Sequence, residues 1–272
     1  MSVVLILKLI LVPLLIAGVT LAGRRWGPAV AGWLSAFPVV SGPILLFMAL
    51  EQGPSFTATA AVGTLSAVLA ILVFGIAYAW AATRHAWPIS LITGFVAYAM
   101  AVTGLSHSTL SLALFAPLVL AALILAPHLY PELPPSAPTP TKPANDIVMR
   151  MLAGALLVML VTHFAAIMGP GLSGILAMFP VMGSVLVVFS HRHVGPSFAI
   201  QLLRGMVLGY YAFGAFCIVL ALTLPTMGIG PAFALALVAA VSIQVMSRHI
   251  ALHSLSKESA PCNESKRSPA AT

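Results

Sequence analysis

Two Phe-Pro pairs, each followed by small residues, are the parts of this sequence whose residue types and spacing favour a binding site. A proline inside a helix removes one backbone donor and frees a carbonyl one turn earlier. The amides at the start of the following half-helix favour an anionic group. The alternative is that each proline only bends a helix for packing. The expected substrate-binding residues on these segments are Phe37, Pro38, Ser41, Gly42, Phe179, Pro180, Gly183 and Ser184.

Four further polar residues are candidates for binding or gating. Arg204 would supply a counter-charge for an anionic substrate, and Gln201, about one turn earlier, would share its face. The alternative for Arg204 is a side chain that reaches the membrane interface. Glu51 and His163 are candidates for gating or proton coupling. Their alternatives are a solvated loop charge for Glu51 and a packing residue for His163.

Catalytic and metal-binding patterns are not found in the sequence. The chain has five acidic residues among 272, and it has no HExxH motif, nucleophile elbow or nucleotide-binding loop. The pairs His191/His193 and His249/His253 lack added Cys, Asp or Glu ligands. We therefore expect no enzyme activity, no catalytic residues, no bound metal and no cofactor.

The composition indicates what kind of element must carry these residues. Hydrophobic residues make up 61% of the chain and charged residues 6%, and the mean hydropathy is +1.09. Soluble domains contain about 25% charged residues. The composition therefore excludes a soluble globular protein and a nucleic-acid binder, and it predicts an all-α polytopic membrane protein.

Apolar runs separated by turn residues predict about nine membrane helices. A tight turn at 104–107 leaves open whether 88–128 forms one span or two. The expected domains are a first repeat of five spans (1–128), a Pro-rich cytoplasmic linker (129–146), a second repeat of four spans (147–248) and a disordered cytoplasmic tail (249–272). The expected spans are 3–22, 27–49, 55–82, 88–104, 108–128, 147–168, 170–190, 196–222 and 226–247.

The basic residues predict an orientation. With nine spans, every Lys and Arg except Lys8 and Arg204 falls on one side of the membrane, while Glu51 falls on the other. Lys and Arg accumulate in cytoplasmic loops. We therefore expect a multi-pass protein of the bacterial inner membrane with its N-terminus outside and its C-terminus in the cytoplasm.

An internal repeat relates residues 27–56 to residues 169–198 without a gap. Twelve of these thirty positions are identical, including both Phe-Pro pairs and the later Gly-Pro-Ser-Phe segments. In the first copy, the basic residues Arg24 and Arg25 come before the Phe-Pro segment. In the second copy, the basic residues His191, Arg192 and His193 come after it. The odd number of spans in the first half and this exchange of basic residues predict inverted-topology repeats.

The two prolines are expected at similar depth. Pro38 and Pro180 should lie about 16 Å and about 15 Å into their spans, given the rise per residue of an α-helix. The hydrocarbon core is about 30 Å thick, so both prolines would lie near its middle. Broken helices that meet there form the substrate sites of inverted-repeat transporters.

A second pattern carries a family resemblance. The segment from Leu172 to Pro180, followed by Leu203-Arg204-Gly205-Met206, resembles the small GlpM-like bacterial inner-membrane proteins. Those proteins have a Gly-Leu-x-x-x-Phe-Pro segment and a later Arg upstream of Gly-Met. The resemblance covers about 40 residues of each half and is weaker in the first, where Val62 replaces the arginine. It implies a membrane location and a fused version of a single-repeat ancestor.

These observations favour a secondary transporter of a small anionic or amphiphilic metabolite. Alternating access would occur about a midplane site between the two Phe-Pro helices. The alternative is a non-transporting structural or accessory subunit of a membrane complex. The expected partners are the lipid bilayer and the small-molecule substrate, with no nucleic acid, and a homo-oligomer is compatible with both hypotheses.

Overall fold

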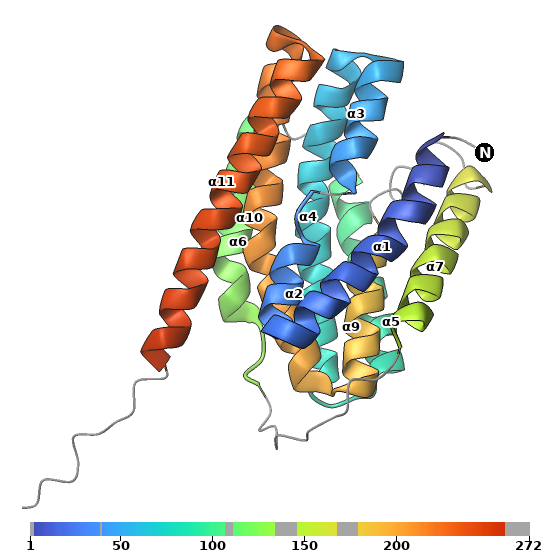
Figure 1. Ribbon diagram of the computed structural model, residues 1–272, viewed down its shortest axis with the longest axis vertical. Helices are drawn as coiled ribbons and strands as arrows, with labels where there is room; N and C mark the ends of the chain where they lie inside the picture. Colours follow the sequence, from blue (N-terminus) through green and yellow to red (C-terminus); the bar gives the residue numbers. More distant parts are fainter. Residues whose placement is uncertain (1–2, 39, 107–110, 134–145, 168–178, 259–272) are drawn as a thin grey trace, which may run out of the picture.

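The computed structural model describes residues 3–38, 40–106, 111–133, 146–167 and 179–258, and these form α-helices with no β-strand. The helices run mainly along the long axis of one bundle (Figure 1). This confirms the expectation of an all-α protein. The helices are α1 (Val3–Trp26), α2 (Pro28–Ser35), α3 (Ser41–Gln52), α4 (Pro54–Ala82), α5 (Trp87–Ser106), α6 (Leu112–Leu129), α7 (Ile147–Ile167), α9 (Val181–His193), α10 (Pro196–Met227) and α11 (Ile229–Glu258).

Six of the described helices are long and apolar enough to cross a membrane. They are α1, α4, α5, α6, α10 and α11. The number of nine crossings stays a prediction, because α2, α3 and α9 are each too short to cross alone and residues 168–178 lie outside the described part of the chain. The region 88–128 does contain two helices, α5 and α6.

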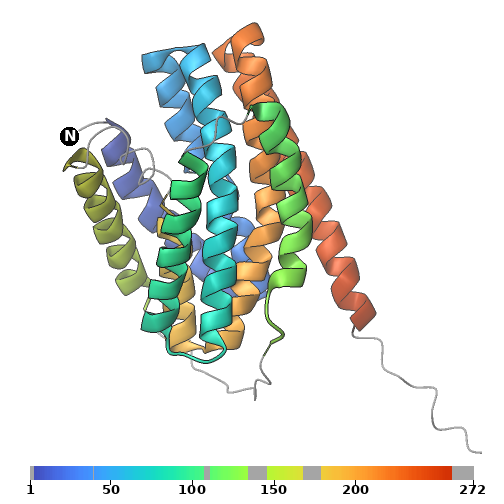
Figure 2. The same cartoon turned by 180° about the vertical axis from the view of Figure 1, so that it is seen from behind.

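Most consecutive helices alternate in direction along the bundle, whereas α2 and α3 run the same way (Figures 1 and 2). The ends of α1, α4 and α9 and the start of α7 lie at one end, whereas α3 ends and α4 begins at the opposite end. We call the first of these the basic end. The arginines at these helix ends are Arg24, Arg25, Arg84, Arg150 and Arg192.

The second expected span, 27–49, is broken into two helices, as the proline in its middle predicts. Helix α2 ends at Ser35 and α3 begins at Ser41, so the chain breaks around Pro38. Proline cannot donate to the helix, and it disfavours helical backbone at the preceding residue, Phe37. The Pro38 carbonyl accepts the Gly42 amide at 2.9 Å, which starts the next helix.

The second copy of the repeat has the same local structure at its described positions. The Pro180 carbonyl accepts the Ser184 amide at 2.9 Å, as α9 begins. Gly53 and Gly195 occupy matching positions with φ of 89° and 122°, a backbone region that favours glycine. Each is followed by a proline at the first position of a long helix. The two hairpins point to opposite ends of the bundle (Figure 1).

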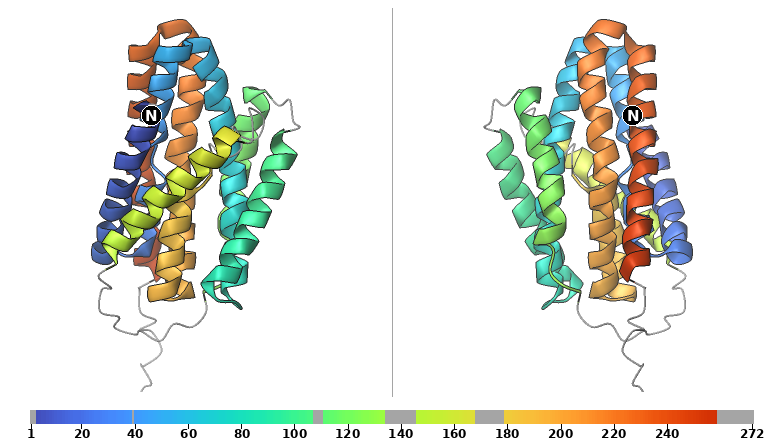
Figure 3. Two further views of the ribbon diagram at one scale, coloured as in Figure 1. Left: turned by 90° about the vertical axis from the view of Figure 1, so that its right-hand side faces the viewer. Right: turned by 90° about the vertical axis from the view of Figure 1, so that its left-hand side faces the viewer.

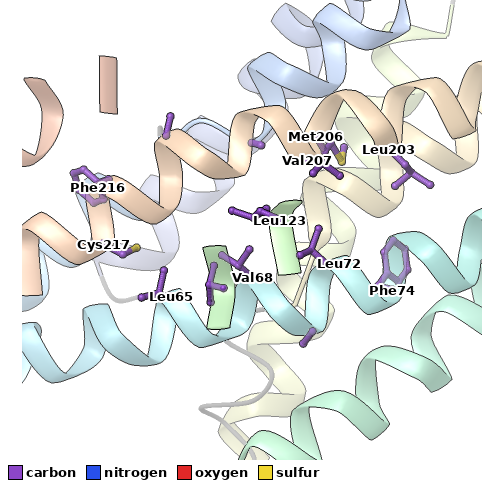
Figure 4. Packing of buried hydrophobic residues seen from close by; sticks show 14 of the residues in the cluster. Leu65, Val68, Leu72, Phe74, Leu123, Leu203, Met206, Val207, Phe216 and Cys217 are labelled. Carbon is purple, nitrogen blue, oxygen red and sulfur yellow. The ribbon is translucent and has the colours of Figure 1, made fainter. Parts of the chain in front are cut away.

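The core lies between α4 and α10, the two helices of the bundle interior. Leu65 and Leu72 of α4 point toward α10, where Cys217 lies across from Leu65 and Val207 lies near Leu72 (Figure 4). Leu123 of α6 lies between the two helices. Van der Waals packing of such side chains aligns α4 and α10 along each other.

Helix α2 packs on α10 with very close backbone contact. A Cβ atom at Gly32 would collide with the Leu202 carbonyl, and one at Gly205 would collide with the Ala29 carbonyl. Gly209 lies one turn further along α10 and also has no room for a Cβ. Small residues four apart allow this approach between membrane helices. The contact fixes the end of α2, and therefore the break at Pro38, against α10.

The two C-terminal helices extend beyond their predicted ends. The span 196–222 was expected to end before Pro225, but α10 continues through it to Met227 and stops before Gly228. Membrane helices tolerate a proline, which removes one backbone donor. Helix α11 continues to Glu258, ten residues into the expected tail, because no glycine or proline interrupts 232–260. Residues 259–272 and linker residues 134–145 lie outside the described part.

Candidate functional site

A cavity of about 290 Å³ lies where the two Phe-Pro breaks meet. We call it the central cavity. Side chains from the end of α2, the starts of α3 and α9, and facing parts of α1, α4, α7 and α10 surround it. Its lining is Val12, Ser35, Ala36, Phe37, Val40, Ser41, Ile44, Leu45, Met48, Ala60, Thr64, Ile71, Val158, Val161, Thr162, Phe179, Pro180, Val181, Met182, Gly183, Met206, Tyr210 and Phe213.

Five of the predicted binding residues line this cavity. They are Phe37, Ser41, Phe179, Pro180 and Gly183. They come from both copies of the repeat, although 142 positions separate Phe37 from Phe179 in the chain. Residues of both Phe-Pro segments therefore line one cavity, and their role in substrate binding stays a prediction.

The prolines determine which helix ends face the cavity. Because each break restarts a helix, α3 and α9 both begin at the cavity wall, with Ser41 at one start and Val181 at the other. The start of a helix carries partial positive charge from its aligned peptide dipoles. Two such starts therefore direct positive potential into a space with mainly apolar walls.

Hydroxyl groups supply the polar part of the lining. The Ser35 hydroxyl donates to the Gly32 carbonyl at 2.7 Å, and the Thr64 hydroxyl donates to the Ala60 carbonyl at 2.8 Å. These two oxygens can therefore act only as acceptors toward a ligand. Among the described residues, the lining has no Asp, Glu, Lys, Arg or His. Such a site suits a compact molecule with apolar surface and few polar groups.

Phe179 is held in place by aromatic neighbours from α5. Its ring lies 4.8 Å from that of Phe95 and 5.9 Å from that of Tyr98, measured between centroids. Aromatic pairs at these separations stabilise each other beyond simple burial. One wall of the central cavity is therefore braced by α5.

Five other predicted residues lie outside the lining. Pro38 is buried at the break, and Gly42 faces Phe216. The Ser184 hydroxyl donates to the Val181 carbonyl at 3.0 Å within its own helix. Gln201 is half-buried on α10.

Arg204, the fifth of these, is directed elsewhere. Its Nη2 donates to the Pro131 carbonyl at 2.8 Å, and its buried Nε has no hydrogen-bond partner among the described residues. The Tyr130 phenol lies close to Arg204. Burial and the neighbouring Tyr210 raise the pKa of this phenol, whereas Arg204 lowers it. Arg204 thus binds the chain that follows α6. Its role as a substrate counter-charge stays a prediction, and it would require the guanidinium to leave Pro131.

The two candidate gating residues also lie away from the lining. Glu51 is exposed near the end of α3, at the end of the bundle opposite the basic end. His163 is exposed on α7. Neither gating role is tested by these positions.

Sequence reasoning missed four polar residues of the lining, which are Ser35, Thr64, Thr162 and Tyr210. Their helices are apolar all round, so no amphipathic pattern shows which face is inward. The sequence did contain a signal for the nearby contact between α2 and α10, because Gly205 and Gly209 are four residues apart on α10.

Comparisons with known proteins add no relative: no family model matches the chain, and no curated protein or solved structure matches it significantly. The resemblance to GlpM-like proteins stays a prediction. Most of the segment that carries it, 172–178, lies outside the described residues.

Proposed function

We propose that this chain is a secondary transporter of a small anionic or amphiphilic metabolite that binds in the central cavity. The observation that carries the proposal is that the Phe-Pro breaks of both repeat copies line one cavity. Discontinuous helices that start at a shared site are the usual binding arrangement in transporters built from repeats.

The local structure of the two copies supports an inverted repeat. Pro38 and Pro180 each accept the amide four residues later, and Gly53 and Gly195 each precede a Pro-started helix. The α3–α4 and α9–α10 hairpins point to opposite ends of the bundle. Rocking one copy against the other would open the central cavity first to one end and then to the other.

The lining supports a substrate class. A volume of about 290 Å³ is at the lower limit of drug-sized pockets, so the substrate is compact. Phe37 and Phe179 would cover its apolar part. The starts of α3 and α9 would stabilise one anionic group, since no basic side chain of the described lining does so. We infer a small amphiphilic anion, such as a short monocarboxylate.

The charge distribution supports an orientation. The arginines of the basic end would face the cytoplasm of a bacterium, and Glu51 would face the outside. The protein would then lie in the inner membrane, with the linker and the C-terminal tail in the cytoplasm.

Uptake into proteoliposomes tests the proposal. The purified chain would be reconstituted, and uptake of radiolabelled short monocarboxylates would be compared with that of neutral analogues. The blocking variant is Gly183→Phe, because a Cβ there meets only Met206 at 3.7 Å and the ring would extend into the cavity. We expect at least a tenfold loss of uptake.

The matched control is Gly63→Phe on α4, an exposed glycine with no atom near its Cβ position. It should retain uptake. Equal uptake by Gly183→Phe and the wild type would contradict a substrate site in the central cavity. A folded wild-type protein that carries none of the compounds would favour the accessory-subunit alternative.

A further inference from the structure

A second cavity, of about 430 Å³, lies at the basic end of the bundle. We call it the basic-end cavity. It lies between α1, α7, α9 and the first turns of α10, and Figure 3 shows α1 and α7 side by side at this edge. Its lining is Val19, Thr20, Gly23, Arg24, Ala31, Asp146, Arg150, Leu186, Ser190, His193, Val194, Phe198 and Leu202. It shares no residue with the central cavity.

One carboxylate in this cavity forms ion pairs with two arginines. Asp146 Oδ1 accepts from Arg24 Nη2 at 2.8 Å, and Asp146 Oδ2 accepts from Arg150 Nε at 2.9 Å. His193 Nε2 lies 3.8 Å from the same Oδ2. With a neutral histidine, the described lining therefore has two positive charges and one negative charge. The excess is one positive charge.

This positive charge is largely removed from water. The side chains of Arg150 and Asp146 are each 7% exposed, and that of Arg24 is 29% exposed. The Arg150 guanidinium carbon lies 5.3 Å from the centre of the Phe189 ring, which adds a cation–π contact but no negative charge. The described lining contains no second acid to balance this charge, and burying an unbalanced charge is costly. The site is therefore electrostatically complementary to an anion.

Thr20 provides an independent observation. It is 7% exposed and lines the cavity, and its hydroxyl has no hydrogen-bond partner among the described residues. A buried hydroxyl normally finds a partner, because leaving it unpaired costs free energy. An anion with several acceptor oxygens in the cavity could accept from Thr20 while it neutralises the arginine pair.

We infer that the basic-end cavity binds a phosphate-type oxyanion, supplied either as free phosphate or as the headgroup of an anionic lipid. Arginine matches the geometry of phosphate oxygens, and basic pockets between membrane helices bind anionic headgroups. The bound group would tie α1, α7 and α9 together at the basic end. This inference does not depend on transport through the central cavity.

Thermal unfolding of the full-length chain tests the inference. The protein would be purified in a neutral detergent, and tryptophan fluorescence would be followed at increasing concentrations of inorganic phosphate, with chloride at equal ionic strength as reference. In parallel, the protein would be placed in nanodiscs of phosphatidylcholine with or without phosphatidylglycerol. We expect the unfolding temperature to rise with phosphate, phosphatidylglycerol or both.

Two variants test whether the stabilising anion binds in the basic-end cavity. Arg24→Gln should raise the half-saturating phosphate concentration about tenfold, because a charged hydrogen bond is lost. Thr20→Val should raise it about threefold and leave the unliganded protein at least as stable, because the hydroxyl has no partner among the described residues to lose. The second variant keeps the test informative if the first folds poorly.

Matched controls come from the same chain. Arg192→Gln removes an exposed arginine at the same end, outside the lining, and should leave binding unchanged. Thr162→Val alters a threonine of the central cavity and should also leave it unchanged.

The outcomes separate the two sources of the anion. Stabilisation by phosphate alone identifies a free anion, and stabilisation by phosphatidylglycerol alone identifies a lipid headgroup, provided that Arg24→Gln and Thr20→Val weaken it. The absence of stabilisation in both arms, or stabilisation that is equal in these variants and the controls, would overturn the inference. Either result can occur whether or not the uptake assay succeeds.

Discussion

The two copies of the repeat share residues both at the break and at the hairpin turn, but the two turns lie among different neighbours. At the break, Phe37-Pro38 and Phe179-Pro180 have the same residues, and both segments contribute to the central cavity. At the far end, Glu51 of the first copy is exposed. Its counterpart His193 lies 3.8 Å from Asp146 in the basic-end cavity.

This difference indicates what each part of a copy does. At the break, Phe37 and Phe179 both line the central cavity, so these two counterparts meet a shared environment. Residues further along face unrelated neighbours. Gly205 lies against the backbone of Ala29, whereas its counterpart Gly63 has open space around its Cβ position. The Phe-Pro residues at the central cavity occur in both copies, whereas the ion-paired residues of the basic-end cavity, Arg24, Asp146 and Arg150, lie outside the repeated segments.

The largest effect is expected at the acidic residue beside the second copy. Asp146→Asn would leave two arginines without their shared carboxylate and should destabilise the protein by about 3–5 kcal/mol. Glu51→Gln, the exposed acid of the first copy, should change stability by less than about 0.5 kcal/mol. Denaturant unfolding in one detergent compares them. Equal losses of stability would contradict the described difference between Asp146, which is buried and ion-paired, and Glu51, which is exposed.

The next-largest effect is the difference in stability between variants of Gly205 and of Gly63, its counterpart in the first copy. Gly205→Ala would push α10 away from α2 and should cost about 2–3 kcal/mol, since the added Cβ meets backbone atoms that cannot move aside. Gly63→Ala should gain about 0.5–1 kcal/mol, because alanine favours a helix and the site is open. Unfolding temperatures measured side by side test this. A stable Gly205→Ala protein would contradict the close α2–α10 contact.

The smallest effect concerns the two phenylalanines of the breaks. Phe179→Leu loses the ring contacts with Phe95 and Tyr98, whereas no ring of the described residues pairs with Phe37. Phe179→Leu should therefore cost about 1 kcal/mol more than Phe37→Leu. Unfolding free energies of the two variants give the difference. A larger loss from Phe37→Leu would mean that the first copy, and not the second, has the braced wall.

The sequence predicted most helices and the break at Pro38 because those features are local. Apolar runs of sufficient length gave α4 and α5 to within a few residues, and Pro38 located the break between α2 and α3. Pro225 was misleading, because a proline near a helix end can be accommodated. The shared position of Phe37 and Phe179 in one cavity could be predicted only because the repeat relates them.

The sequence alone determined that this is an all-α membrane protein with repeated, proline-broken segments. Composition and hydropathy are sums over the chain, and a proline acts on its own helix, so neither needs a distant partner. Only the tertiary structure decided that Arg204 turns to Pro131 and that Arg24 meets Asp146, 122 residues away. Such contacts depend on which helix faces are brought together, and helices that are apolar all round do not encode that choice in a local pattern.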